Sequence, residues 1–233
     1  MTLEKITESR QSGAKRRYDD ACGTAHGLEL IGERWALLVM RELMLGPKRF
    51  SDLRADLPGI SANVLTQRLE GLEENGLVVR KRLPPPANTQ VYELTEWGYE
   101  AEPIVQTLGR WAARSPAHDP TLPISATSIM LSFRTMYNAE KARALGATIG
   151  FRFPDDSFIA TAGENELKVT RGDPAGSDAI FIGQPTVLGA AVYDKQPLDQ
   201  LATAGVLQVE GDREAAERFI SIFELPPKVG AAR

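Results

Sequence analysis

The sequence predicts an α+β protein of two domains. The first is an N-terminal winged helix-turn-helix, mostly α with a two-stranded wing, and the second is a C-terminal antiparallel sheet covered by helices. Residues 59–76 form an amphipathic pattern with a helix start and a helix stop at its ends, and two β-like runs follow it. A proline-rich stretch, residues 114–123, precedes a second half of short strands and helices. With 233 residues, 42% of them hydrophobic, the chain can bury one or two ordinary cores.

The domain boundaries follow from these patterns. We expect a flexible N-terminal arm over 1–20, the winged DNA-binding and dimerisation domain over 21–114, a linker over 115–124, the second domain over 125–227 and a tail over 228–233. The arm contains Lys15, Arg16 and Arg17, a basic run that could reach phosphate or a minor groove if the arm is not simply disordered.

Composition narrows the class of protein. The single cysteine, Cys22, excludes a disulfide within the chain and favours a reducing compartment. No apolar run approaches the length of a membrane span, and the N-terminal residues lack the apolar core of a secretory signal. We therefore expect a cytoplasmic protein without membrane contact.

Net charge gives no direct sign of nucleic-acid binding. The chain carries −4 overall, with 16 basic and 16 acidic residues in 1–118 and 11 against 15 in 119–233. DNA binding by the first half must therefore depend on a local basic surface.

The first half begins with three short helical patterns before the long one. Residues 24–32 read as a helix with Leu28 and Ile31 inward, and residues 51–57 as a brief third helix. Between them, residues 33–45 form a helix that ends at Gly46-Pro47, with an apolar stripe made of Trp35, Leu38, Val39 and Leu43.

The helix expected over 59–76 has the features of a DNA-reading element. Ser61 can cap its start, and its buried stripe comprises Leu65, Leu69 and Leu72. The opposite side carries Asn63, Thr66, Gln67 and Glu70. Because Asn and Gln pair with the adenine edge in the major groove, this helix can read DNA. On this stretch alone, an ordinary amphipathic surface helix is the alternative.

Two strands follow this helix. Residues 77–83 and 91–94 are joined by the sequence PPPANTQ, which is too long for a tight turn and predicts a projecting wing. Arg80 and Arg82 share one strand face and can contact phosphate, whereas Lys81 takes the other. An edge hairpin protected by charge against aggregation is the alternative.

Residues 95–114 return to a helical pattern in which Ile104, Leu108 and Trp111 form an apolar stripe. Pro103 should bend this helix or mark a restart. The stripe can pack against a second subunit or against the second half of the same chain, and both alternatives stay open.

The run IGERWALLVMRELMLGPKRFSDLRADLPGISANVLTQRLEGLEENGLVVRK, followed by VYELTEWG, lies within about residues 22–111. It resembles the HxlR-type winged-helix transcription regulators, relatives of the MarR group. The resemblance implies a homodimer on a pseudo-palindromic double-stranded DNA operator, with the helix of residues 59–76 in the major groove and the wing on the flanking backbone. The DNA-binding candidates are Lys48, Arg49, Ser51, Ser61, Asn63, Thr66, Gln67, Arg68, Arg80 and Arg82. For Arg68, an ion pair with an acidic neighbour is an equal alternative.

Cys22 occupies the position of a cysteine that in some members of this family senses oxidants, although Gly23 stands where proline is usual. Since Asp19 and Asp20 would raise the pKa of its thiol, we expect a half-buried structural thiol and keep the redox sensor as the alternative. His26 and His118, the only histidines, assemble no zinc site or catalytic set with it. The sequence therefore predicts no metal, cofactor or enzymatic activity.

The second half alternates strands and helices. Helices are expected over 125–137, 185–193, 197–204 and 212–223, and strands over 149–153, 158–162, 167–170, 179–182 and 206–210. The order predicts an antiparallel meander with helices on one face.

The segments VLQVEGDREAAERFISIFELPP and IGQPTVLGAAV resemble the sterol-carrier-protein-like fold. This resemblance implies a hydrophobic tunnel for a fatty acyl or similar apolar effector. The candidate lining residues are Met130, Phe133, Phe151, Phe158 and Phe181, each of which could instead fill a core.

Together these patterns favour a transcription regulator, a repressor more than an activator, controlled by an apolar ligand in its second domain. The alternative is a lipid or acyl carrier whose winged domain mediates dimerisation or protein docking.

Overall fold

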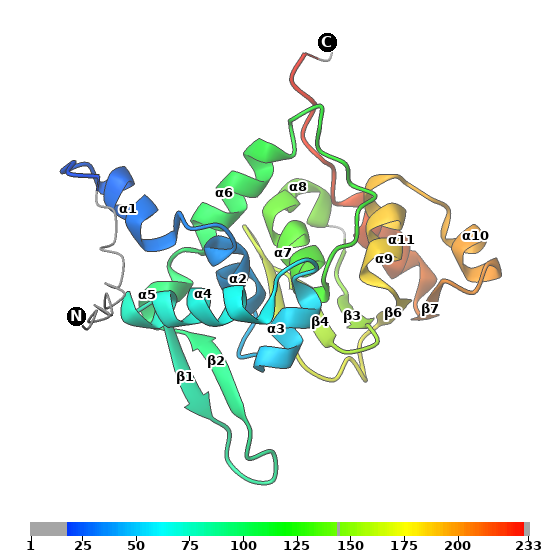
Figure 1. Ribbon diagram of the computed structural model, residues 1–233. Coiled ribbons are helices and arrows are strands. Elements are labelled where there is room, and N and C mark those ends of the chain that lie inside the picture. The colour runs from blue at the N-terminus through cyan, green and yellow to red at the C-terminus, as the bar shows by residue number, and fades with distance from the viewer. Residues whose placement is uncertain (1–17, 144, 231–233) are drawn as a thin grey trace, which may run out of the picture.

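The computed structural model describes residues 18–143 and 145–230. Most of the predicted N-terminal arm and residues 231–233 of the predicted tail lie outside this range. Figure 1 shows the two halves side by side, with the N-terminal helices and a projecting hairpin next to a five-stranded sheet and its helices.

The N-terminal half is a winged helix-turn-helix. Its elements are α1 (Gly23–Ile31), α2 (Ala36–Leu43), α3 (Phe50–Asp56), α4 (Ala62–Glu74), β1 (Val78–Arg82), β2 (Gln90–Leu94), α5 (Glu96–Tyr99) and α6 (Glu102–Ala112). The predicted signals delimit α4, because the Ser61 hydroxyl accepts from the Val64 N–H and Gly76 takes a φ of 72°. The Leu77 N–H then closes the end by donating to the Leu72 carbonyl at 2.9 Å.

Two expectations for this half needed the structure. The helical pattern of 95–114 is divided into α5 and α6, with Pro103 in the first turn of α6, which confirms the restart. The inward placement of Leu28 and Leu38 is wrong, since they are 49% and 39% exposed. The physical reason for Leu28 is that α1 lies at the edge of the domain and buries only Ala25.

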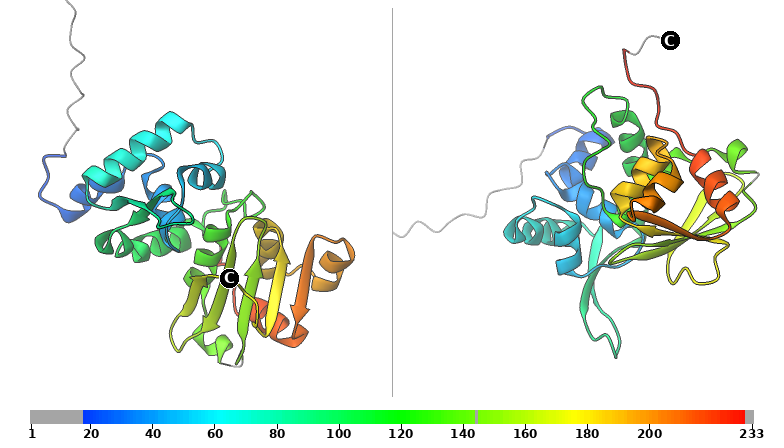
Figure 2. Two further views of the ribbon diagram at one scale, coloured as in Figure 1. Left: turned by 90° about the horizontal axis from the view of Figure 1, so that it is seen from below. Right: turned by 90° about the vertical axis from the view of Figure 1, so that its right-hand side faces the viewer.

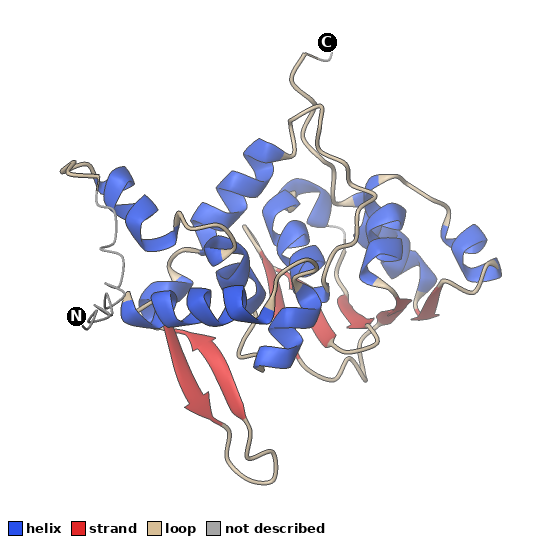
Figure 3. Ribbon diagram, viewed as in Figure 1, coloured by secondary structure: helices blue, strands red, loops and turns tan. Residues whose placement is uncertain are grey.

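The C-terminal half is a sheet with helices on one face. Its elements are α7 (Ala126–Met136), α8 (Ala139–Ala142), β3 (Thr148–Arg152), β4 (Ser157–Ala162), β5 (Leu167–Arg171), β6 (Ala179–Gly183), α9 (Pro185–Tyr193), α10 (Leu198–Thr203), β7 (Leu207–Gly211) and α11 (Arg213–Ser221). Figure 3 shows the strands and the surrounding helices, and the left view of Figure 2 shows the face of the sheet that helices leave open.

The strand order is β5-β4-β3-β6-β7, which corrects the predicted meander. Neighbouring strands are antiparallel except β3 and β6, which are parallel. The reason is the connection over 172–178, which crosses the open face of the sheet before β6 begins. A Cβ at Gly150 would lie 2.6 Å from Pro174 Cβ, so the glycine permits this crossing.

An aromatic core joins this sheet to its helices. The rings of Phe133, Phe219 and Phe223 lie 4.8–5.5 Å apart between centroids, and Phe151 contacts Phe181 at 5.8 Å. The five residues expected to line a tunnel, Met130, Phe133, Phe151, Phe158 and Phe181, are each fully buried in this core. The structure therefore favours the alternative of a filled core, and none of the five lines the groove of this domain that is described below.

A buried charge cluster joins the two halves. The carboxylate of Glu42, on α2, has no exposed surface and lies 3.1 Å from Lys48 Nζ and 2.8 Å from Arg41 Nη2. The same carboxylate accepts hydrogen bonds from the hydroxyls of Ser125 and Ser128, at the start of α7. Burial alone would raise the pKa of Glu42, but Arg41, Lys48 and Ser125 outweigh it, so the pKa lies below the ordinary 4.5.

We predict that Glu42→Gln lowers the free energy of unfolding by about 3 kcal/mol at neutral pH, because it leaves the buried ammonium of Lys48 with only the partly exposed Asp56 as an anionic partner. Since the folded-state pKa of Glu42 is lowered, its ionised form stabilises the protein above the ordinary value of 4.5, and this contribution is lost as pH falls through the folded-state pKa. The difference between wild type and E42Q should therefore shrink in acid.

Urea denaturation at about pH 7 and about pH 4 measures both effects. Glu210→Gln is the control, because the Glu210–Arg152 pair is exposed and should contribute less than about 1 kcal/mol. An E42Q deficit of equal size at both pH values would contradict the prediction.

Candidate nucleic-acid interface

Helix α4 presents a polar face on an apolar anchor. Leu65, Leu69 and Leu72 are 0–1% exposed and hold the helix against the domain. On the other side Asn63, Thr66 and Gln67 are exposed, together with Glu70. The side chains that the sequence assigned to base contacts therefore project freely into solvent. Ser61 is exposed as well, but its hydroxyl is engaged in capping the helix.

The predicted phosphate contacts near the start of α3 differ in their exposure to solvent. Arg49 and Ser51 are exposed, and the Ser51 hydroxyl donates to Asp52 Oδ1 at 3.0 Å. Lys48 is only 3% exposed, and its ammonium is held by Glu42 and, at 2.5 Å, by Asp56. The assignment of Lys48 to DNA is therefore wrong, because a buried and paired ammonium cannot reach a phosphate.

Arg68 is also engaged within the protein. Its Nη2 lies 3.4 Å from Glu33 Oε2, and the side chain is 21% exposed. The structure thus shows the ion pair that sequence analysis kept as the alternative to DNA contact.

The wing projects below α4 (Figure 1) and holds its arginines differently. Arg80 Nη2 donates to Glu73 Oε2 at 2.8 Å, and its guanidinium lies 5.3 Å from the Tyr92 ring. The hydrogen bond to Glu73 is the main reason that the pKa of Arg80 is raised. Arg82 Nε donates to the neutral amide oxygen of Asn88 at 2.8 Å. The partner of Arg82 in this hydrogen bond is neutral, whereas Arg80 is paired with the Glu73 carboxylate. Arg82 is therefore better placed than Arg80 to bind a phosphate.

Residues 30–119 match the family model for the HxlR-like helix-turn-helix. The HTH-type transcriptional regulator YodB of Bacillus subtilis is 40% identical over 83 residues, which span 36% of this chain and 74% of that protein. The uncharacterised HTH-type transcriptional regulator YkvN of the same organism is 42% identical over 94 residues, or 39% of this chain and 77% of that protein. The chain belongs to the HxlR-like helix-turn-helix family.

The family membership makes this chain a DNA-binding regulator of transcription. The solved structure of reduced YodB from B. subtilis is similar to it with a TM-score of 0.38 and 35% identity, covering 42% of this chain and 98% of that one. Residues 131–224 match the SCP-2 sterol transfer family. An HxlR-like domain is therefore followed by an SCP-2 domain, as the two resemblances in the sequence implied.

Helix α6 of the HxlR-like domain has two different sides. Glu102 pairs with Arg134 of α7 at 3.0 Å, and Arg110 donates to the Thr135 carbonyl, so the polar side docks onto the SCP-2 domain. On the other side Ile104, Leu108 and Trp111 are 52%, 45% and 70% exposed. Within the described residues 18–143 and 145–230, the apolar stripe is therefore left uncovered and is available for a second subunit.

Cys22 precedes α1 and is exposed, so the expectation of a half-buried thiol is wrong. Hydrogen bonds from the backbone and hydroxyl of Thr24 and from the Ala25 backbone lower the pKa of the Cys22 thiol below 9.0. A role in redox sensing stays a prediction.

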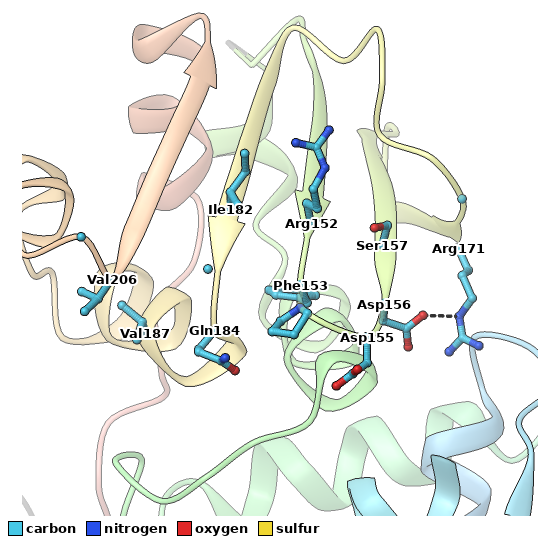
Figure 4. A pocket seen from close by; sticks show the side chains of 14 residues that line it. Arg152, Phe153, Asp155, Asp156, Ser157, Arg171, Ile182, Gln184, Val187 and Val206 are labelled. Atoms are coloured by element: carbon cyan, nitrogen blue, oxygen red, sulfur yellow. Dashed lines mark ion pairs between the residues drawn. The ribbon is translucent and has the colours of Figure 1, made fainter. Parts of the chain in front are cut away.

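A groove of about 960 Å³ opens in the SCP-2 domain where β3 and β6 end (Figure 4). Its apolar lining comes from Phe153, Ile182, Val187 and Val206, and its charged lining from Arg152, Asp155, Asp156 and Arg171. The groove shares Asp155, Asp156 and Arg171 with a cleft of about 820 Å³ between the two domains. Sequence analysis missed this site because its lining comes from strand ends and turns that no motif marks.

Two further findings concern other classes of site. Among residues 18–143 and 145–230, no cluster of three or more His, Cys, Asp or Glu side chains is arranged to hold a metal ion. Within the same ranges, no helix combines the length and apolar character needed to cross a membrane.

We predict that Arg49→Ala weakens binding to every duplex by a similar factor, because Arg49 is exposed at the start of α3 and should neutralise a phosphate. The slope of log K against log salt should fall by about one unit. Titration of a labelled duplex at several salt concentrations measures both quantities. Lys168→Ala, which removes an exposed charge of the SCP-2 domain, serves as the control, and an unchanged slope for R49A would refute the phosphate contact.

Proposed function

We propose that this chain is a homodimeric repressor that reads a pseudo-palindromic operator through α4 and answers to an apolar ligand of its SCP-2 domain. The observation that supports this best is the exposed face of α4, where Asn63, Thr66 and Gln67 stand on a leucine-anchored helix. This face combines the side chains that recognise adenine with the rigid support that base readout needs.

The remaining contacts follow from this orientation. Arg49, Ser51 and Arg82 flank α4 and would contact the phosphates on either side, with Arg80 and Ser61 in supporting positions. The protein would act in the cytoplasm, where it occludes the promoter DNA on which it sits.

Control by ligand requires a site in the SCP-2 domain and unequal affinity for two states of the dimer. The groove of about 960 Å³ is a candidate site, since Phe153, Ile182, Val187 and Val206 offer it an apolar lining. The same groove supports a second candidate function, an acyl carrier whose HxlR-like domain only dimerises.

Replacing both Asn63 and Gln67 by alanine separates the two functions. If α4 reads bases, the double variant should lose about 1–3 kcal/mol of discrimination for each bidentate contact and bind its operator hardly better than random DNA. Competition binding with a duplex from the promoter region of its own gene and with random DNA measures this. Gln208→Ala, an exposed glutamine of the SCP-2 domain, is the matched control. Unchanged base preference in a folded double variant would favour the carrier.

The dimer is tested at the exposed stripe of α6. Leu108→Glu should convert a dimer into a monomer, because it places a charge in the centre of an apolar interface formed twice by symmetry. Native mass spectrometry reports the mass of the assembly and of any bound small molecule. Leu122→Glu, at a residue that is 62% exposed between α6 and α7, is the control. A dimer that survives L108E would place the interface elsewhere.

A further inference from the structure

We propose that Arg171 of the SCP-2 domain is a positioning residue for DNA reading, which holds the turn at residues 46–49 and so links the ligand domain to the helix-turn-helix and the wing. This inference rests on the proposed function only in that the HxlR-like domain must bind specific DNA.

The turn at 46–49 is joined to the wing, to α2 and to α3. The backbone of Lys48 pairs with Tyr92 of β2, through hydrogen bonds of 3.0 and 2.8 Å, and so fixes the base of the wing. The Lys48 ammonium bridges Glu42 on α2 and Asp56 on α3. Arg49, which directly follows, caps α3 through its N–H to Asp52. A displacement of this turn must therefore move α3 and the wing together.

Arg171 reaches this turn from the other domain. It is the last residue of β5, and its Nη1 donates to the Pro47 carbonyl at 3.3 Å. Within its own domain the guanidinium pairs with Asp156 at 3.0 Å and lies 5.5 Å from the Phe158 ring. Figure 4 shows Arg171 and Asp156 side by side at the edge of the groove. The guanidinium of Arg171 therefore forms an ion pair within the SCP-2 domain and a hydrogen bond to the HxlR-like domain.

A molecule bound in the groove could disturb the hydrogen bond between Arg171 and the Pro47 carbonyl. Arg171 lines both the groove of the SCP-2 domain and the cleft between the domains. An occupant that moves Arg171 or its partner Asp156 would release the Pro47 carbonyl. The contacts of Glu42 with Ser125 and Ser128, and those of α6 with α7, would still keep the domains joined. Arg171 can therefore loosen the turn without separating the domains.

The experiment compares Arg171→Ala with Arg213→Ala in the full chain. Arg213 is the matched control, because it is also an arginine of the SCP-2 domain, pairs with Asp199 at 2.7 Å within its own domain and lines neither the groove nor the cleft. The DNA probe is a fluorescein-labelled duplex selected from a random-sequence library by the wild-type protein. Fluorescence anisotropy at several salt concentrations gives the affinity and its salt slope, and hydrogen exchange reports the backbone of 46–49 and 90–94.

We expect R171A to weaken binding about five-fold with an unchanged salt slope, because DNA must then order a turn that the SCP-2 domain no longer holds. Exchange in 46–49 and 90–94 should become faster. R171K should recover part of the affinity, since its ammonium can still donate to the Pro47 carbonyl, and R213A should behave as wild type.

Wild-type affinity for R171A, or equal losses for R171A and R213A, would overturn the inference. If R171A does not fold, Arg171→Gln replaces it and is compared with R171K by the same criteria, since glutamine keeps part of the packing on Phe158. A wild-type protein that selects no duplex would instead refute the proposed function, so the two failures are distinguishable.

Discussion

The carboxylate of Glu42 is buried between the two domains. The packing of α2 against α7 depends on cations and hydrogen-bond donors that compensate its negative charge. Lys48 and Arg41 supply the counter-charges, and the hydroxyls of Ser125 and Ser128 supply hydrogen bonds from the start of α7. A carboxylate this deeply buried is stable only when its lone pairs are satisfied, so the SCP-2 domain completes the folding of α2. Apolar residues of the same volume could stabilise the boundary equally well. The advantage of the buried charges is that they fix which surfaces of the two domains are joined.

This attachment leaves the DNA-reading surface free. The SCP-2 domain is joined through α2, α6 and the turn before α3, whereas the polar face of α4, the wing and the apolar side of α6 remain exposed. A domain docked in this way can influence DNA binding only through the elements that it touches. The turn at residues 46–49 is such an element, and its Lys48 backbone also pairs with Tyr92 of the wing.

Local signals in the sequence predicted the local structure well. The cap at Ser61, the stop at Gly76 and the leucine stripe of α4 each depend on neighbours within a few residues, so they could be read before the fold was known. The same holds for the restart at Pro103 and for the apolar stripe of α6, although the exposure of that stripe could be seen only in the structure. The parallel pairing of β3 with β6 was missed because it depends on where the connection over 172–178 passes, which no local pattern indicates.

Two of the predicted DNA contacts are paired within the protein, with partners on other elements of the fold. Lys48 and Arg68 have the sequence positions of DNA contacts, yet Lys48 is neutralised by Glu42 and Asp56 and Arg68 by Glu33. A basic residue contributes to DNA affinity only if its charge is not already met within the protein, and that depends on the tertiary structure. Among the predicted arginine contacts, Arg49 and Arg82 are thus the better placed for phosphate. With a net charge of −4 on the chain, binding should rely strongly on base contacts from α4 as well.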